Sequence, residues 1–511
     1  MLINTNNQFK VLLIAMPNVH VGINELITVP NLGISSIAGN LQNCSFLTLD
    51  LVLVKNDIEK FLFKIIKEYS PDIVGLSCMS FQYVTAIEIA KRIKKWKPQV
   101  KIAIGGYHPT LLCTTIGESP DIKYLDFVVK NEGEKSFNSI VQAIQTESDF
   151  GCISNISFKR NGSLIHNNCE SILSLDEINY PDRTHRILNN FRIMNKKSDV
   201  LETSRGCVLP CTFCSIRSMY GKSFRKYSYD RVITDIKNIK KLGTKYIFIV
   251  DDNITLDIKR FMNLCDQIVE NNLNDIDYIV QASCKGIASS WELAKKMRNA
   301  GFKICFLGIE NASKKNLDFL SKGKDTLEES KRAVAYLREN KIGVLGGFIL
   351  GNPDDDEEDL RDNFRFSKEL KIDGPLYFVS TPHYGTELRK NMLKENLVTN
   401  TEDFSWYNGS YANVRTKFLS SDDIDRLVQK MYAQFADFDS IVHGIIWRRH
   451  ILFFLKRFVK NGSIQIYRSL KRIFKKHKDP FIEARERDVK RRKRWFLQTD
   501  TNRIDRLVKN H

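Results

Sequence analysis

The sequence predicts the α/β fold class: an N-terminal doubly wound (Rossmann-like) parallel sheet, then a partial (β/α)6 TIM-like barrel, then a basic helical C-terminal tail. The prediction depends on two series of short apolar runs that alternate with helix-like stretches, and on positive charge that gathers near the C-terminus. A chain of 511 residues has room for about two to four domains. Its 42% apolar and 27% charged residues exclude collagen-like, disordered and disulfide-scaffold proteins.

Residues 9–148 contain the first series. Its apolar runs are KVLLIAMP, SFLTLDLVLV, DIVGLSC, VKIAIGG and LDFVVKNEGE, and amphipathic stretches such as AIEIAKRIKKW lie between them. This alternation predicts a parallel sheet covered by helices on both faces. Ligands of such folds bind beyond the carboxyl ends of the strands. There the chain has small or polar residues: Ser77, Gly105, Gly106, Glu132, Gly133 and Glu134. Glycines at strand ends are also ordinary turn formers.

Residues 149–195 are expected to form a linker with a hairpin, because ISNISFKRNGSLIHN has Asn161-Gly162 at a turn position. Residues 196–405 contain the second series, with the runs DVLETS, YIFIVDD, YIVQAS, FKICFLGIE, IGVLGGFILG and LYFVST separated by helical stretches. Six such units predict a partial barrel with its chemistry at the carboxyl ends of the strands. Residues 406–511 are expected to form a helical basic region.

Three cysteines, Cys207, Cys211 and Cys214, directly follow the first strand of the second series, in the segment ETSRGCVLPCTFC. This spacing puts three thiols on one tight loop, where thiolates can hold the irons of a cluster. Three ligands for four irons leave one iron open, so a small molecule can chelate it and receive an electron. The alternatives are a zinc knuckle, which usually has a fourth Cys or His nearby, and buried structural thiols. Eleven cysteines in 511 residues are too sparse for a disulfide framework.

The C-x3-C-x2-C loop, with an aromatic residue before the last Cys, resembles that of the radical S-adenosylmethionine enzymes. The domain in front of it is similar to the cobalamin-binding domain of a large subgroup of them, and the resemblance covers about residues 9–405. The resemblance implies that Cys207, Cys211 and Cys214 bind a [4Fe-4S] cluster. Its open iron would take the amino and carboxylate groups of S-adenosylmethionine. Cobalamin is the third cofactor that the resemblance implies.

Further site residues follow from the resemblance alone. Around S-adenosylmethionine they are Asp251, Asp252, Glu310, Gly347, Gly351 and Pro382. Around cobalamin they are Ser77, Gly105, Gly106, His108, Thr110, Glu132, Gly133 and Glu134. Each has a structural alternative: the glycines turn the chain, the aspartates cap a helix, and His108 stabilises its own loop. The Asp-x-His-x-x-Gly motif that supplies a histidine to cobalt is absent, because His20 lacks the Asp. No lower histidine ligand is therefore expected.

These cofactors imply that a deoxyadenosyl radical removes hydrogen from an unactivated carbon and that methylcobalamin supplies a methyl group. The leading hypothesis is a cobalamin-dependent radical methyltransferase. It would act on a small-molecule or lipid substrate, such as a natural-product precursor, with a one-electron reductant such as flavodoxin or ferredoxin. One alternative is rearrangement or oxidation with the same cofactors. Another is a methylthiotransferase that holds a second cluster on Cys44, Cys78 and Cys113, although their contexts favour buried structural thiols.

The tail carries most of the net charge of +18, because residues 441–511 hold twenty-one Lys or Arg against six Asp or Glu. Residues 441–496 mix aromatic and basic residues, which suits an interfacial helix on an anionic membrane or a helical cap on the barrel. Nucleic acid is the least favoured partner, and a scaffold that works through its tail is the non-enzymatic alternative. The sequence predicts no membrane span and no secretory signal. We therefore expect a cytoplasmic protein, with peripheral contact at the inner membrane face.

Overall fold

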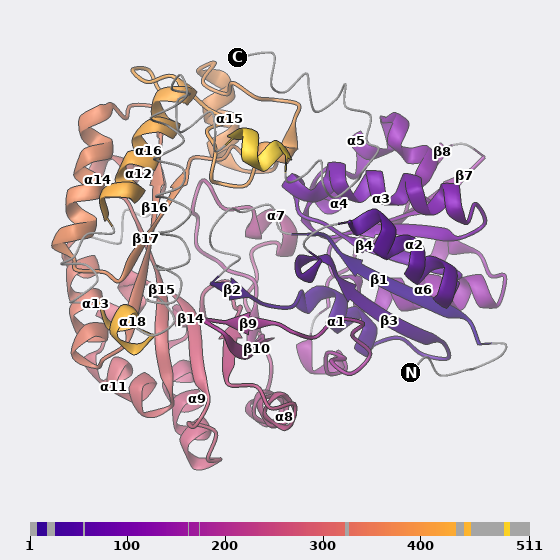
Figure 1. Ribbon diagram of the computed structural model, residues 1–511, viewed down its shortest axis with the longest axis horizontal. Coiled ribbons are helices and arrows are strands. Elements are labelled where there is room, and N and C mark those ends of the chain that lie inside the picture. Colours follow the sequence, from indigo (N-terminus) through magenta and orange to yellow (C-terminus); the bar gives the residue numbers. More distant parts are fainter. Residues whose placement is uncertain are drawn as a thin grey trace, which may run out of the picture.

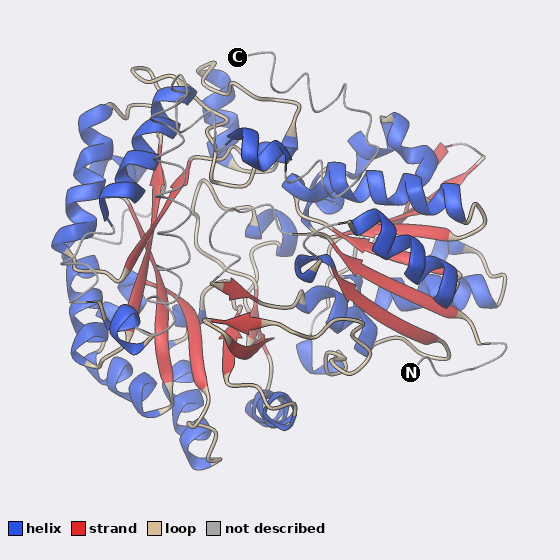
Figure 2. Ribbon diagram, viewed as in Figure 1, coloured by secondary structure: helices blue, strands red, loops and turns tan. Residues whose placement is uncertain are grey.

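The computed structural model describes residues 8–17, 26–54, 57–161, 163–172, 174–321, 327–435, 444–450 and 485–490. Two α/β units lie beside each other, and the chain passes from the first to the second near β9 and β10 (Figure 1). The first unit is a mostly parallel sheet between helices, and the second is a curled sheet with helices on its outer side (Figure 2). The predicted fold class is confirmed.

The front unit is a seven-stranded sheet with the order β3-β1-β4-β5-β6-β7-β8, in which the first five strands are parallel. Its strands are β1 (Lys10–Ala15), β3 (Ser45–Asp50), β4 (Ile73–Ser77), β5 (Lys101–Gly105), β6 (Phe127–Val129), β7 (Ile156–Arg160) and β8 (Ser163–His166). The last two form the expected hairpin, which pairs antiparallel with β6. This part of the predicted linker therefore extends the front sheet.

Helices cover both faces of the front sheet. Successive side chains of each strand point to opposite faces, and both sets are buried under helices. Leu12 and Ile14 of β1 pack in one core with α2 (Ile58–Tyr69) and α3 (Tyr83–Trp96). Val11 and Leu13 pack in another core with α1 (Leu32–Gly39) and α6 (Gly133–Gln145). Burial on both faces explains why the strands read as uninterrupted apolar runs. Two short helices, α4 (Tyr107–Leu111) and α5 (Cys113–Glu118), follow β5.

The second unit is an eight-stranded sheet with the order β17-β16-β15-β14-β13-β10-β9-β2. Its six parallel strands are β10 (Lys196–Leu201), β13 (Tyr246–Ile249), β14 (Asp277–Ser283), β15 (Phe302–Glu310), β16 (Gly343–Leu350) and β17 (Gly374–Val379). The helices are α8 (Tyr229–Lys241), α9 (Ile258–Glu270), α10 (Cys284–Ala288), α11 (Trp291–Asn299), α12 (Lys314–Phe319), α13 (Leu327–Glu339), α14 (Glu357–Glu369), α15 (Glu387–Lys394) and α16 (Ser421–Phe435). All six predicted strands are present, with small shifts at their ends.

Two short strands tie the units together in a way that the sequence did not predict. The strand β2 (Ile27–Thr28) leaves the front unit and pairs antiparallel with β9 (Arg192–Ile193), at the edge of the barrel sheet. A second small ladder joins β11 (Ser204–Arg205) to β12 (Arg225–Lys226). This ladder closes the segment that holds the cysteines and the helix α7 (Ile216–Tyr220).

Only two short pieces of the basic tail are described. The helix α18 (Ile445–Arg449) packs against the start of β16, and residues 485–490 are helical. The rest of the predicted interfacial helix, 441–443, 451–484 and 491–496, lies outside the described residues. In the part of the chain that is described, no helix is both long enough and apolar enough to cross a membrane.

Candidate functional site

A cavity of about 380 Å³ lies between the two units. From the front unit it is lined by the carboxyl ends of β4 and β5, by the start of α1 and by the loop after β6. From the barrel it is lined by Val200, Glu202, Arg205, Met219, Tyr220, Val250 and Asp252. Both sets come from carboxyl ends of parallel strands or from the segments that follow, where α/β folds bind ligands.

The predicted cobalamin residues Ser77, Gly105, Gly106, Glu132, Gly133 and Glu134 all line this cavity. Gly106 has to be glycine for two reasons. Its φ of +105° is one that side chains rarely adopt, and a Cβ atom there would stand 2.6 Å from the carbonyl oxygen of Cys78. The loop between β5 and α4 therefore reaches the cavity with bare backbone.

Thr110 and His108 do not line the cavity. The Thr110 hydroxyl donates to the Gly106 carbonyl and accepts from the Asn131 N–H, both at 2.8 Å, so it joins two of the lining loops. The His108 ring is buried and stacks on Tyr83, with a centroid distance of 4.2 Å. Burial lowers the pKa of His108 to about 3, so the ring is neutral. In the structure both side chains hold the loop, and their contact with the cofactor stays a prediction.

The cysteines lie on the loop between β11 and α7, beside the barrel wall of the cavity. Burial raises the pKa of Cys214 to about 12, and the thiols of Cys211 and Cys207 add to the rise, so the three sulfurs are electrostatic neighbours. Among the described residues, no three His, Cys, Asp or Glu side chains converge closely enough for a single metal ion. The donor set of three thiols on one loop fits an iron–sulfur cluster with an open iron.

Tyr107 of α4 connects the front unit to the cysteine loop. The helix α4 packs against α7, and burial raises the pKa of Tyr107, with further effects from Tyr220, Asp252 and Cys214. Tyr107 and Tyr220 both line the cavity. Tyr107 therefore lies near Cys214 and Tyr220 on one side of the cavity.

The two predicted aspartates have different places. Asp251 is buried and accepts three hydrogen bonds of 2.6 Å, from the Thr203 N–H, the Thr203 hydroxyl and the Ser204 hydroxyl. Asp252 accepts from the Gly206 N–H at 2.9 Å and lines the cavity. Burial raises the pKa of each to about 6. Asp251 thus holds the start of the cysteine segment, and Asp252 presents a carboxyl group at the cavity.

The remaining predicted residues lie along neighbouring strands at the barrel mouth and outside the cavity lining. Glu310 ends β15 with a φ of +68°, where the pairing with β16 shifts register. Gly347 is inside β16, where a Cβ atom would meet the Phe306 ring at 2.9 Å. Gly351 has a φ of +78° just after β16, and the Pro382 carbonyl accepts from Arg389. That these four residues contact S-adenosylmethionine stays a prediction.

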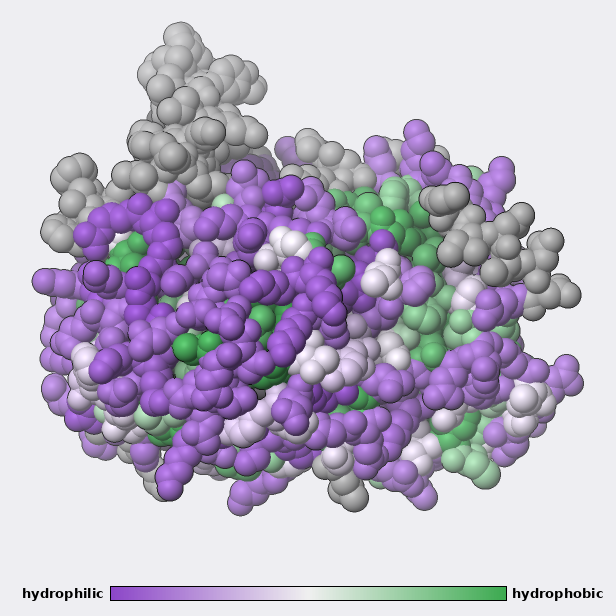
Figure 3. Space-filling view, turned by 90° about the horizontal axis from the view of Figure 1, so that it is seen from below, coloured by the Kyte–Doolittle hydropathy of each residue, from purple (hydrophilic) through white to green (hydrophobic). Residues whose placement is uncertain are grey.

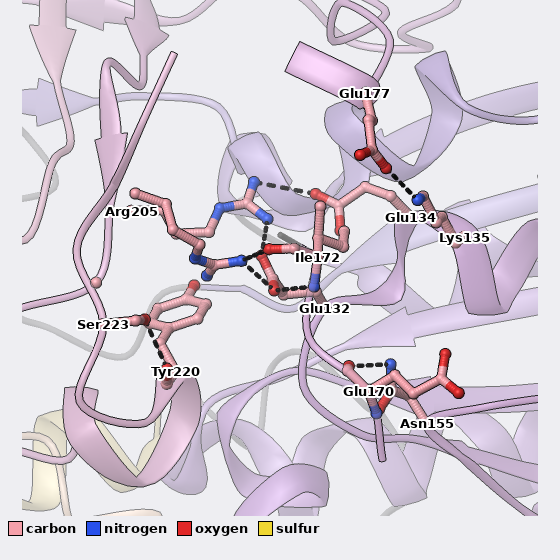
Figure 4. A network of polar contacts seen from close by, with 12 residues as sticks. Glu132, Glu134, Lys135, Asn155, Glu170, Ile172, Glu177, Arg205, Tyr220 and Ser223 are labelled. Atoms are coloured by element: carbon pink, nitrogen blue, oxygen red, sulfur yellow. Dashed lines mark hydrogen bonds and ion pairs between the residues drawn. The ribbon is translucent and has the colours of Figure 1, made fainter. Parts of the chain in front are cut away.

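An ion network that the sequence did not predict crosses from the front unit to the cysteine segment (Figure 4). Arg205 donates to Glu132 at 2.7 Å, to Glu134 at 3.0 Å and to Glu202 at 2.9 Å. Arg225 also donates to Glu132 at 2.7 Å. Burial alone would raise the pKa of Glu134, but Arg205 and the Ser36 hydroxyl outweigh it and lower the pKa. Glu132 and Glu134, which were predicted as cobalamin residues, thus join the two units through their carboxylates.

Two family models match this chain. Residues 201–367 match the Radical SAM superfamily, and residues 23–141 match the B12 binding domain. The chain is 29% identical over 465 residues to an uncharacterized methyltransferase of Pyrococcus horikoshii, which covers 89% of this chain and 98% of that protein. It is 24% identical over 472 residues to the anaerobic magnesium-protoporphyrin IX monomethyl ester cyclase of Cereibacter sphaeroides, covering 87% and 74%. It is 24% identical over 399 residues to the hopanoid C-3 methylase of Methylococcus capsulatus, covering 76% and 72%.

Solved structures share the fold. OxsB, a cobalamin-dependent S-adenosylmethionine radical enzyme with aqua-cobalamin and S-adenosylmethionine bound, matches with a TM-score of 0.68 and 19% identity, over 98% of this chain and 80% of its own. TsrM of Kitasatospora setae, a radical S-adenosylmethionine methyltransferase with cobalamin and a [4Fe-4S] cluster bound, matches with a TM-score of 0.62 and 18% identity, over 78% and 76%. The arrangement of a front sheet against a partial barrel is therefore common to all three proteins.

Proposed function

The chain belongs to the radical S-adenosylmethionine enzymes that carry an N-terminal B12-binding domain, and we propose that it methylates a carbon atom of a small-molecule substrate. The observation that carries this proposal is the cavity between the units. One wall comes from the loops of the B12-binding domain and the other from the segment of the three cysteines. A methyl donor and a radical source would thus face the same space.

The residues present suit the three groups. Cys207, Cys211 and Cys214 would hold a [4Fe-4S] cluster, and the mouth of the barrel beside them would take S-adenosylmethionine. Ser77, the bare Gly105-Gly106 backbone and Gly133 would hold cobalamin at the front wall. When bound, these groups supply one-electron cleavage of S-adenosylmethionine and a transferable methyl group.

The protein's own residues enclose and position this space. Arg205, held by three carboxylates, fixes the segment just before Cys207 against the loop after β6. Tyr107 and Tyr220 are partly buried and line the cavity between the units. A water-poor enclosure suits radical chemistry because it prevents side reactions of the reactive species. The candidate for a lower histidine ligand, His20, lies outside the described residues.

The test uses anaerobically reconstituted full-length protein with iron, sulfide, cobalamin, a strong reductant and S-adenosylmethionine with a deuterated methyl group. We expect release of deoxyadenosine, and movement of the deuterated methyl group first to cobalamin and then to a metabolite in a small-molecule extract. The triple variant Cys207→Ala, Cys211→Ala, Cys214→Ala should keep bound cobalamin and release no deoxyadenosine. Deoxyadenosine release without any labelled product would contradict methylation but would agree with another radical reaction.

A second candidate function is radical oxidation or cyclisation with the same cofactors. It is favoured by the relative from Cereibacter sphaeroides, which is named as a cyclase and aligns with 87% of this chain. The same assay separates the two functions, because cyclisation consumes S-adenosylmethionine and changes a metabolite without adding a deuterated methyl group. A lipid substrate and a flavodoxin or ferredoxin as reductant remain part of the proposal.

A further inference from the structure

A cluster of cations lies under the barrel, at the end opposite the cysteine loop. Its lining residues are Arg298, Arg338, Lys341, Ile445, Arg448 and Arg449, and they surround an open hollow of about 630 Å³, here called the basal hollow. They come from the ends of α11 and α13 and from α18, which packs at the start of β16. The view from below shows a mostly hydrophilic surface over the barrel (Figure 3).

Within the described part of the chain, few acidic groups lie near the cations of the basal hollow. Among its described lining residues there is no carboxylate, and Asp373 beneath it stands 3.8 Å from Arg338 and accepts the Ile446 N–H. The ends of α11 and α13 contribute about half a negative charge each. Asp277 also lies close enough to act on the Arg449 charge. Among the described residues, the five cations still outnumber the acidic groups near them.

Two of the five cations donate to backbone carbonyls of the barrel. Arg449 donates to the backbone carbonyls of Lys303 and Lys341, both at 3.1 Å, and Arg338 donates to the carbonyl of Lys371. The two Arg449 bonds fix α18 to the barrel. The Nη1 atom of Arg298, in contrast, is buried and has no hydrogen-bond partner within the described chain. A buried guanidinium N–H without an acceptor costs about 1–3 kcal/mol, so an acceptor from outside the chain would be stabilised there.

We propose that the basal hollow binds a phosphate group, with the guanidinium groups of Arg298 and Arg448 and the ammonium group of Lys341 as its donors. A guanidinium group matches two phosphate oxygens with a planar pair of N–H donors, and the surrounding excess of positive charge favours a multiply charged anion. Two sources carry this chemistry: a soluble phosphate ester and a phospholipid headgroup. The site lies across the barrel from the candidate active site, so it is independent of the proposed reaction.

Calorimetric titration of full-length protein with inorganic pyrophosphate tests the site. We expect the double variant Arg298→Met, Arg448→Met to bind pyrophosphate at least tenfold more weakly than the wild type. Arg298→Lys keeps the charge but loses the planar pair of donors, and should weaken binding several-fold. The matched control is Arg365→Met, which removes an equal charge from α14, where Arg365 pairs with Glu358 and Asp362. Circular dichroism checks that each variant folds.

Sedimentation with vesicles identifies the source. If phosphatidylglycerol vesicles retain the wild type, and retain the double variant at least fivefold less, the ligand is a lipid headgroup. If pyrophosphate binding alone depends on Arg298 and Arg448, the ligand is a soluble phosphate ester. Phosphatidylcholine vesicles are the control for surface adsorption. The proposal is overturned if the double variant binds both pyrophosphate and phosphatidylglycerol as the wild type does.

Discussion

Arginine side chains cluster at both ends of the barrel, and the two clusters differ in the number of carboxylates around them. At the carboxyl end, Arg205 is buried and contacts Glu132, Glu134 and Glu202. At the other end, five cations line the basal hollow with no carboxylate among its described lining residues. A buried cation that is paired with several carboxylates holds the segments that carry them in one arrangement. A group of cations without nearby carboxylates can instead bind an anion from solution. The first cluster therefore positions the units, and the second is suited to a ligand.

Removing the buried cation should have the largest effect. Arg205→Met leaves Glu134 and Glu202 without their cation and leaves Glu132 with Arg225 alone. Losing one partner of a buried pair costs about 3–5 kcal/mol. We expect a large fall of the guanidinium unfolding midpoint of the apo protein. Arg365→Met, at an exposed and paired arginine, should change the unfolding free energy by less than about 0.5 kcal/mol. Equal stability of the two variants would contradict the positioning role of Arg205.

Neutralising one carboxylate should have a smaller effect. Glu134→Gln keeps the shape of the side chain, and Arg205 keeps Glu132 and Glu202, so we expect a loss of about 1.5–3 kcal/mol. The pKa of Glu134 is lowered in the folded protein, so its contribution is complete above the pKa of the unfolded chain and is lost as the pH falls through the folded value. The difference in unfolding free energy between Glu134→Gln and the wild type should therefore be smaller at pH 4 than at pH 7. Curves that stay equally far apart would show that the Glu134 charge is not involved.

The contrast between the two clusters also marks the limit of what the sequence could predict. Strands such as β1, β4 and β6 were predictable because they are buried on both faces and read as apolar runs. The two-residue strand β2 was not, since Ile27–Thr28 is too short to show a period. The resemblance to a known family predicted Glu132 and Glu134 as cobalamin residues, and the structure shows their carboxylates bound to Arg205, more than 70 residues away. A contact of this kind leaves no local pattern, although Glu202 and Arg205 do precede the first cluster cysteine.

The boundary between the units also holds a neutral histidine, whose loss of stability at low pH can be compared with that of the charged Arg205 network. His108 stacks on Tyr83 and meets Phe404 of the barrel unit, and its pKa of about 3 lies below the value of about 6.5 in an unfolded chain. Stability is therefore complete above about pH 6.5 and is lost as the pH falls toward 3, by about 2 kcal/mol at pH 5. His108→Phe should remove this loss, as judged by unfolding midpoints at pH 7 and pH 5. A wild type that is equally stable at both values would refute the burial of a neutral ring.

Removing cations from the basal hollow should change stability the least, and any change should be a stabilisation. Its cations repel one another, so Arg298→Met, Arg448→Met should leave the thermal midpoint unchanged or raise it slightly at low ionic strength. Because the Debye length falls from about 10 Å at 0.1 M salt to about 3 Å at 1 M, sodium chloride should stabilise the wild type more than the double variant. Differential scanning calorimetry over this salt range measures both effects. A double variant that is destabilised as strongly as Arg205→Met would mean that these arginines are structural. The two ends of the barrel would then use their charge in the same way.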